Sequence, residues 1–210
     1  MCSADQSEAR FLLDTNILVD FALDILREQL SDDERKAATF ARELVLLSNC
    51  RLLIPEIAVS VEFPRAFLRA ILERHVTNED KLKACINMLK YIERTLKRAG
   101  HEIVKCWDVN VLKTAAGWFY RIEREKGFDW VRRRHQDLII LATAKANNSG
   151  LITRNPDDFV EMMNIVSSRT PLCIVKVSGS QVQVTWLYTE PVDCVMNLIA
   201  SKTQRCPVEP

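Results

Sequence analysis

This sequence of 210 residues lacks an excess of charge of either sign. Its 29 Lys and Arg are balanced by 28 Asp and Glu, which leaves a formal net charge of +1. A protein held to nucleic acid mainly by phosphate neutralisation usually carries a clear basic excess. The composition therefore excludes a generic basic coat for DNA or RNA, although it permits a local separation of charge.

Long apolar runs and paired cysteines are also missing. No stretch reaches the roughly 18 to 20 apolar residues that a membrane span requires. Residues 1–10 lack the basic and apolar parts of a secretory signal. The seven cysteines are scattered, with no CxxC pair and no nearby His. We therefore expect a cytoplasmic protein without membrane contact, in which most cysteines are buried thiols rather than zinc ligands.

Short apolar runs alternate with helical patterns along most of the chain. Runs at 11–13, 51–55 and 151–153 predict buried strands, and 103–106 predicts another short one. Short strands that alternate with helices predict an α/β domain, with a mostly parallel sheet covered by helices on both faces. The clearest helical patterns lie at 32–47, 77–99, 111–126 and 136–147.

The pattern changes after Pro171. Residues 172–177 and 181–188 are rich in β-branched and aromatic side chains and flank Ser178-Gly179-Ser180, which predicts a β-hairpin. We therefore expect one domain over residues 1–170 and a C-terminal extension, 171–210, packed on it.

Four acidic residues stand at strand-to-helix junctions or helix starts: Asp14, Glu62, Asp137 and Asp158. In a parallel α/β sheet such junctions gather at the carboxyl ends of the strands, where ligands bind. Each of the three aspartates also has an ordinary explanation as a helix cap or as a charge that favours a helix N-terminus. Glu62 lies among apolar residues, where an unpaired charge is strongly disfavoured.

Carboxylates that share one cleft repel one another, and this raises some of their pKa values unless a cation is present. Their hard oxygen atoms select Mg²⁺ or Mn²⁺. Such a metal lowers the pKa of a bound water and stabilises the charge that develops in phosphodiester hydrolysis.

Four segments resemble the motifs of PIN domains, the metal-dependent ribonuclease fold that includes the VapC-type toxins of toxin–antitoxin pairs. They are FLLDTNILVD at 11–20, IPEIAVSVE at 54–62, DLIILATA at 137–144 and LITRNPDDF at 151–159. All four follow the order that the family shows, so the signal is more specific than any one motif.

The resemblance implies a PIN-like three-layer fold and a sequence-selective endoribonuclease. It also implies that Asp14, Glu62 and Asp137 hold one or two Mg²⁺ or Mn²⁺ ions, with Asp158 as a fourth acid. The resemblance implies three partners for the chain: the RNA substrate, a second copy of the chain in a homodimer, and an antitoxin protein that neutralises the enzyme.

The sequence departs from the family pattern at two places. Many members carry Asp where this chain has Asn155, so the fourth ligand is Asn155 through its amide oxygen, Asp158, or a bridging water. Glu62 also lies one residue later after Pro55 than the pattern predicts, which leaves Glu56 as an alternative.

Basic residues near the third and fourth motifs are candidates for contact with the RNA backbone. Arg132, Arg133 and Arg134 directly precede the Asp137 motif, and Arg154 lies in the fourth motif. The usual explanation of such a basic run is a solvated helix face. The hydroxyls of Thr15 and Thr153 could orient Asp14 or bind a phosphate, and ordinary capping or turn bonding is the alternative.

Two other functions compete with a ribonuclease. A non-catalytic PIN-like module that binds RNA or protein is favoured by Asn155, by the long segment 64–110 and by the C-terminal hairpin. A structure-specific nuclease that acts on DNA or RNA is the third candidate.

Overall fold

The computed structural model describes residues 10–24, 30–47, 51–72, 78–166, 173–178 and 181–187. Within this part, six strands form one sheet in the order β3-β2-β1-β4-β5-β6. The strands are β1 (Arg10–Leu13), β2 (Arg51–Pro55), β3 (Glu102–Val104), β4 (Gly150–Thr153), β5 (Cys173–Ser178) and β6 (Gln181–Leu187). All neighbouring strands are parallel except β5 and β6, which are antiparallel. The predicted α/β class and mostly parallel sheet are confirmed.

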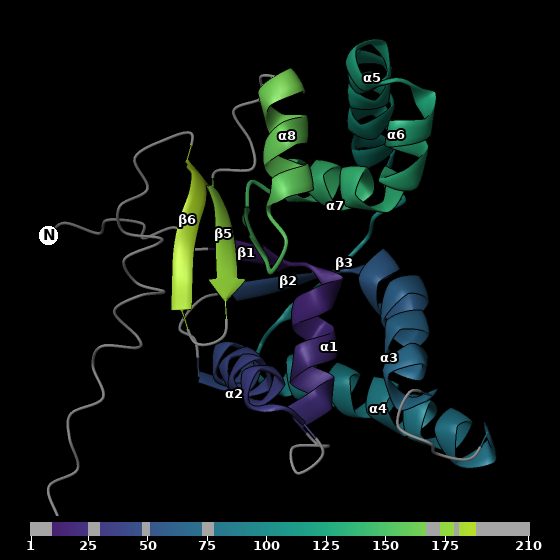
Figure 1. The fold of residues 1–210 in the computed structure, drawn as a ribbon, viewed down its shortest axis with the longest axis vertical. Coiled ribbons are helices and arrows are strands. Elements are labelled where there is room, and N and C mark those ends of the chain that lie inside the picture. The colour runs from purple at the N-terminus through teal and green to yellow at the C-terminus, as the bar shows by residue number, and fades with distance from the viewer. Residues whose placement is uncertain are drawn as a thin grey trace, which may run out of the picture.

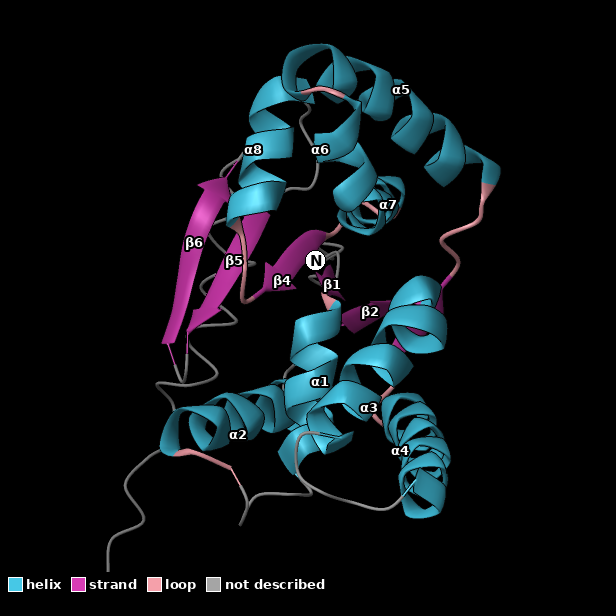
Figure 2. Ribbon diagram, turned by 45° about the vertical axis from the view of Figure 1, so that its right-hand side comes forward, coloured by secondary structure: helices cyan, strands magenta, loops and turns pink. Residues whose placement is uncertain are grey.

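Helices cover both faces of the sheet, as the sequence predicted (Figure 1). Figure 2 shows α1 to α4 on one side and α5 to α8 on the other. The first group is α1 (Thr15–Leu23), α2 (Asp32–Leu47), α3 (Phe63–Leu72) and α4 (Asn78–Arg98), with a π-helical turn, η2 (Ala58–Glu62), directly before α3. The second group is α5 (Val109–Lys126), α6 (Phe128–Arg133), α7 (His135–Ala146) and α8 (Asp157–Val166).

The central strand β1 shows why its short apolar run forms a buried strand. Successive side chains of a strand point to opposite faces of the sheet. Phe11 and Leu13 accordingly pack in the core under α1 to α4, while Leu12 packs in the core under α5 to α8. A strand that is covered on both faces needs such a continuous apolar sequence. It also places Asp14, the next residue, at the carboxyl edge of the sheet.

The C-terminal strands form the predicted hairpin pair. β5 pairs with β4 in the main sheet, and β6 lies antiparallel to β5 as the next strand outward. The hairpin's turn at 179–180 and the tail 188–210 lie outside the described residues. Cys106 and Cys173 are buried thiols, as expected, and the side chains of the other cysteines are not described.

Among the helices that the structure describes, none is both long and apolar enough to span a membrane.

Candidate active site

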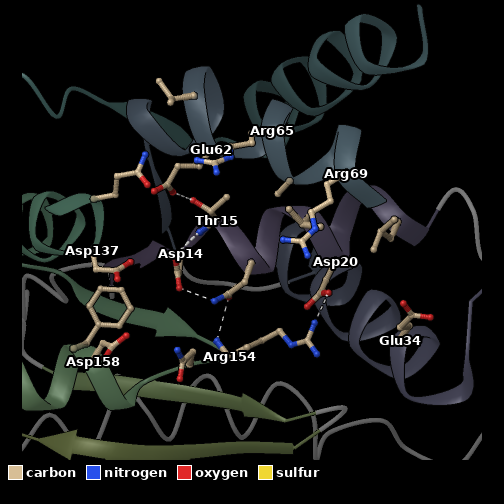
Figure 3. A pocket seen from close by; sticks show the side chains of 18 residues that line it. Asp14, Thr15, Asp20, Glu34, Glu62, Arg65, Arg69, Asp137, Arg154 and Asp158 are labelled. Carbon is tan, nitrogen blue, oxygen red and sulfur yellow. Dashed lines mark hydrogen bonds and ion pairs between the residues drawn. The ribbon is translucent and has the colours of Figure 1, made fainter. Parts of the chain in front are cut away.

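A cleft of about 670 Å³ lies where the strands end and the following helices begin (Figure 3). Asp14, Glu62, Asp137 and Asp158 all line this cleft. Asp14 follows β1, Glu62 ends η2, Asp137 lies in the first turn of α7, and Asp158 lies in the first turn of α8. The fold thus brings together the four acids that the sequence singled out, from segments that are far apart in the chain.

Asp14 is held in place by a set of hydrogen bonds. The Thr15 backbone N–H donates to its Oδ1 at 2.7 Å, while Asn16 Nδ2 and Thr153 Oγ1 both donate to its Oδ2 at 2.6 Å. Burial raises the pKa of Asp14, and these hydrogen bonds partly offset the rise. Asp14 is therefore both the N-cap of α1 and a carboxylate of the cleft, so the two interpretations of this residue are compatible.

Two threonine hydroxyls are used to position these acids. The Thr15 hydroxyl donates to Glu62 Oε2. The Thr153 side chain is fully buried, and besides donating to Asp14 it accepts a hydrogen bond from the Asn155 backbone N–H at 3.0 Å. The structure therefore shows that the two threonine hydroxyls orient the acids, which is one of the roles that the sequence left open. Contact of Thr15 or Thr153 with RNA stays a prediction.

Glu62 reaches the cleft through an irregularity in its helix. The Phe63 backbone N–H donates to the Ala58 carbonyl, five residues back, so this turn contains one residue more than an α-helical turn. The extra residue accounts for the place of Glu62 one position later after Pro55 than the PIN pattern predicts. Glu56, the alternative, lies outside the residues that line the cleft.

The four acids act on one another electrostatically. The pKa of Asp137 is raised to about 7, first by burial and then by the charges of Asp14, Glu62 and Asp158, while the charge of Arg134 opposes the rise. Burial also raises the pKa of Glu62, and the charge of Asp14 adds to this rise. Like charges in a poorly solvated cleft favour the protonated form, or the binding of a cation in place of the proton.

Asp158 is paired with a cation of the chain itself. Arg134 Nε lies 2.6 Å from Asp158 Oδ1, and the Arg134 guanidinium stacks over the Trp130 ring at 4.2 Å from its centroid. Arg132 and Arg133, the other predicted RNA contacts before Asp137, are exposed on α6 and do not line the cleft. Their contact with RNA, and that of Arg134, stays a prediction.

Asn155 also lines the cleft, as Asp158 does. Its backbone N–H donates to Thr153, while the side chain is exposed. The structure therefore keeps both Asn155 and Asp158 as candidates for the fourth ligand.

Asp20 is an acid of the cleft that the sequence analysis missed. Asp20 lies on α1 and is buried, and its carboxylate accepts a hydrogen bond from Arg154 Nη1 at 2.8 Å. Burial raises the pKa of Asp20 to about 6, although Arg154 opposes the rise. The sequence does contain a signal for this residue: Asp20 is an acid among apolar residues such as Leu18 and Phe21, which is the pattern that singled out Glu62.

The donor chemistry of the cleft fits a divalent cation. Within the described residues, no three Asp, Glu, His or Cys side chains stand close enough together to hold one metal ion. Mg²⁺ is commonly bound through only one or two carboxylates, with water and substrate phosphate as the remaining ligands. Carboxylate oxygens are the donors that Mg²⁺ and Mn²⁺ prefer. The residues present therefore fit such an ion in kind, with water among its ligands.

The sequence matches no protein-family model and no curated protein. Among solved structures, it is similar to a chain in the structure of FitAB bound to an IR36 DNA fragment. The TM-score is 0.46 at 19% identity, over 72% of this chain and 90% of that one. It is also similar to a chain of VapBC2 from Rickettsia felis bound to a DNA fragment from their promoter. Here the TM-score is 0.42 at 19% identity, over 74% of this chain and 95% of that one.

The chain has a PIN-like fold on the ground of its own three layers and of the four motifs that meet at one edge of the sheet.

Proposed function

We propose that this protein is a Mg²⁺- or Mn²⁺-dependent endoribonuclease that hydrolyses RNA phosphodiester bonds. One observation carries the proposal: the acids of four separate PIN-like motifs line the same cleft, and three of them raise the pKa of the fourth, Asp137. A structural role for each acid as a helix cap would not require them to share a cleft.

The residues divide into ligands and supports. Asp14, Glu62 and Asp137 would hold one or two ions, each ion bound through one or two carboxylates and water. Such an ion would supply a water of lowered pKa and stabilise charge on the phosphate. Asn16 and Thr153 fix the Asp14 carboxylate by donating to its Oδ2. Ligands that are held in this way lose less freedom when they bind an ion, and such supporting residues typically contribute about 10- to 100-fold to metal affinity or activity.

Cleavage of an end-labelled RNA with Mg²⁺ tests the proposal. We expect cleavage by the native protein to stop with EDTA, and Asp14→Asn and Asp137→Asn each to lower its rate at least about 100-fold, because a bound metal contributes several kcal/mol to charge stabilisation. Asp129→Asn is the matched control, since Asp129 is an exposed aspartate of α6 outside the cleft. Cleavage that survives EDTA, or full activity in both cleft variants, would contradict the proposal.

A specific observation favours the non-catalytic alternative. Asp14 already accepts three hydrogen bonds, and Asp158 is paired with Arg134. A module of this kind would bind RNA or protein without cleaving it, and its affinity would not depend on Mg²⁺. Equal cleavage of matched DNA and RNA oligonucleotides would instead support a structure-specific nuclease.

The biological setting is proposed from the resemblance alone. We propose that the enzyme acts as the toxin of a VapBC-type pair, that an antitoxin protein neutralises it, and that it is a cytoplasmic homodimer. A small DNA-binding protein encoded directly upstream would support this setting.

A further inference from the structure

The end of the cleft away from Asp137 and Asp158 differs from the acidic end in charge. It is lined by three arginines, Arg65, Arg69 and Arg154, together with Asp20 and Glu34. Figure 3 shows Arg65 and Arg69 reaching in from α3, while Arg154 comes from the opposite wall beside Asp20. The same cleft therefore joins an acidic end to an end where arginines are in excess.

Arg154 is fixed in position on two sides. Its backbone N–H donates to Asn16 Oδ1 at 3.1 Å, and its Nη1 donates to Asp20 Oδ1 at 2.8 Å. The Arg154 side chain nevertheless remains 45% exposed, whereas that of Asp20 is 6% exposed. Because a guanidinium carries five N–H donors, the bond to Asp20 leaves other donors for a ligand. Asp20 thus orients a guanidinium whose remaining donors face the cleft.

Arg65 and Arg69 extend this cationic surface along α3. Residues four apart in a helix lie on the same face, so the two side chains are neighbours, and like charges at this spacing repel one another. Arg65 is exposed and makes no ion pair or hydrogen bond with any residue that the structure describes. An anion between α3 and Arg154 would relieve this repulsion and would bind several guanidinium groups at once.

We propose that Arg65, Arg69 and Arg154 form a second subsite, which binds an RNA phosphate next to the one at the acidic end, with Asp20 as a positioning residue. This inference rests on the proposed ribonuclease function. The acids Asp14, Glu62, Asp137 and Asp158 repel a phosphate, so they cannot hold the RNA backbone by charge alone. Nucleic acid carries a negative charge at every nucleotide, and a basic subsite in the same cleft supplies the attraction that the acids lack.

The size of the cleft indicates which kind of RNA fits. Its volume of about 670 Å³ lies within the range of pockets that enclose a small ligand, about 300 to 1,000 Å³. A space of this size fits a short single-stranded segment of RNA. Arg65, Arg69 and Arg154 would recognise the backbone and not the bases.

Binding of a fluorescent octauridylate RNA in EDTA tests the subsite apart from catalysis. We expect Arg65→Ala and Arg69→Ala each to raise the Kd about fivefold, as for an exposed ion pair. Each should also reduce the slope of log K against log salt by about 0.7, the value for one phosphate contact to a single strand. Arg98→Ala, at the end of α4 and outside the cleft, is the matched control.

The role of Asp20 needs a readout that a structural effect would not produce. In the cleavage assay, Asp20→Asn should raise KM several-fold and leave kcat nearly unchanged, because it loosens Arg154 without touching the acidic end. Arg154→Lys provides a second variant that keeps the charge beside Asp20 but loses the planar set of donors. We expect Arg154→Lys likewise to raise KM several-fold and to leave kcat nearly unchanged.

The outcomes separate this inference from the proposed function. If the native protein cleaves RNA but Arg65→Ala and Arg69→Ala keep its Kd and salt slope, the subsite is wrong and the ribonuclease stands. If the variants weaken binding but the native protein never cleaves, the subsite is supported and the proposed function fails. If only Arg133→Ala weakens binding, the RNA lies on α6. If Arg65→Ala and Arg69→Ala lower the Tm without changing the Kd, these arginines have only a structural role. Either of these last two results overturns the subsite.

Discussion

At the residue scale, the candidate site depends on side chains that orient one another before any ligand binds. Thr153 is the centre of this arrangement, because its hydroxyl donates to Asp14 and accepts from Asn155. The hydroxyl is fully buried, so its loss would leave a buried carboxylate oxygen and a backbone N–H each with one hydrogen bond fewer. Leaving a buried polar group unsatisfied costs about 1 to 3 kcal/mol.

Replacing Thr153 by Val keeps the shape of the side chain and removes only the hydroxyl. We expect Thr153→Val to lower the free energy of unfolding by about 1 to 3 kcal/mol and to lower the cleavage rate about 10- to 100-fold. Urea unfolding and the RNA cleavage assay measure the two effects. Thr143→Val is the matched control, because Thr143 is also fully buried and its hydroxyl donates to the Ile139 carbonyl of its own helix, but it does not line the cleft. Equal effects of both substitutions on activity would contradict this role of Thr153.

Asp137 leads to a prediction about pH. Its pKa in the folded protein is about 7, above the ordinary value of 3.8, so the folded state binds the proton more tightly than the unfolded state. This contribution to stability is fully present below about pH 3.8 and is lost as the pH rises through about 7. In EDTA, Asp137→Asn should therefore raise the Tm by several degrees at pH 8, and the rise should shrink as the pH falls towards 4. A Tm difference that is the same at pH 5 and pH 8 would contradict this account of the cleft.

Much of the site could be predicted from single residues. Asp14, Glu62, Asp137 and Asp158 stand in motifs whose order is visible in the chain, and the structure places all four in one cleft. The Asp20–Arg154 pair could not be predicted in the same way. Its two residues are 134 positions apart, and only the packing of α1 beside β4 brings them together.

At the element scale, the regular elements follow their sequence patterns closely. The predicted helix at 32–47 is α2, with the same bounds, and the strand at 51–55 is β2. Helix α6 was not predicted, because its six residues are too few to show a helical period among their charges. The π-helical turn η2 was not predicted either, because one extra residue shifts the spacing of apolar residues only within that turn.

The π-helical turn yields a prediction about chain length. Deleting Ser60, an exposed residue of η2, should convert the turn to a regular α-helix and leave Glu62 on the face that lines the cleft. We expect this deletion to keep RNA cleavage within about threefold of the native rate, since the reach of Glu62 is preserved. Ser60→Ala, which leaves the number of residues unchanged, is the control. Loss of cleavage in the deletion, with full activity in Ser60→Ala, would show that Glu62 needs the π-helical turn.

At the scale of the whole molecule, a net charge of +1 is compatible with an uneven distribution of charge along one cleft. Figure 3 shows Asp137 and Asp158 toward one end of the cleft, and Arg69 and Arg154 with Asp20 and Glu34 toward the other. The composition permitted a separation of positive and negative charge but could not show where it lies, because Arg65 and Arg69 do not belong to any of the four motifs. A divalent cation at the acidic end would make the field along the cleft more favourable to RNA.

The claim that four separate motifs build one metal centre is tested most directly by calorimetric titration of Mn²⁺ at pH 7.5. At this pH the Asp137 carboxyl, with a pKa of about 7, is mostly ionised. The account predicts saturable binding by the native protein that Asp14→Asn and Asp137→Asn each abolish and that Asp129→Asn preserves. Absence of binding to the native protein, or equal binding by all four proteins, would contradict it.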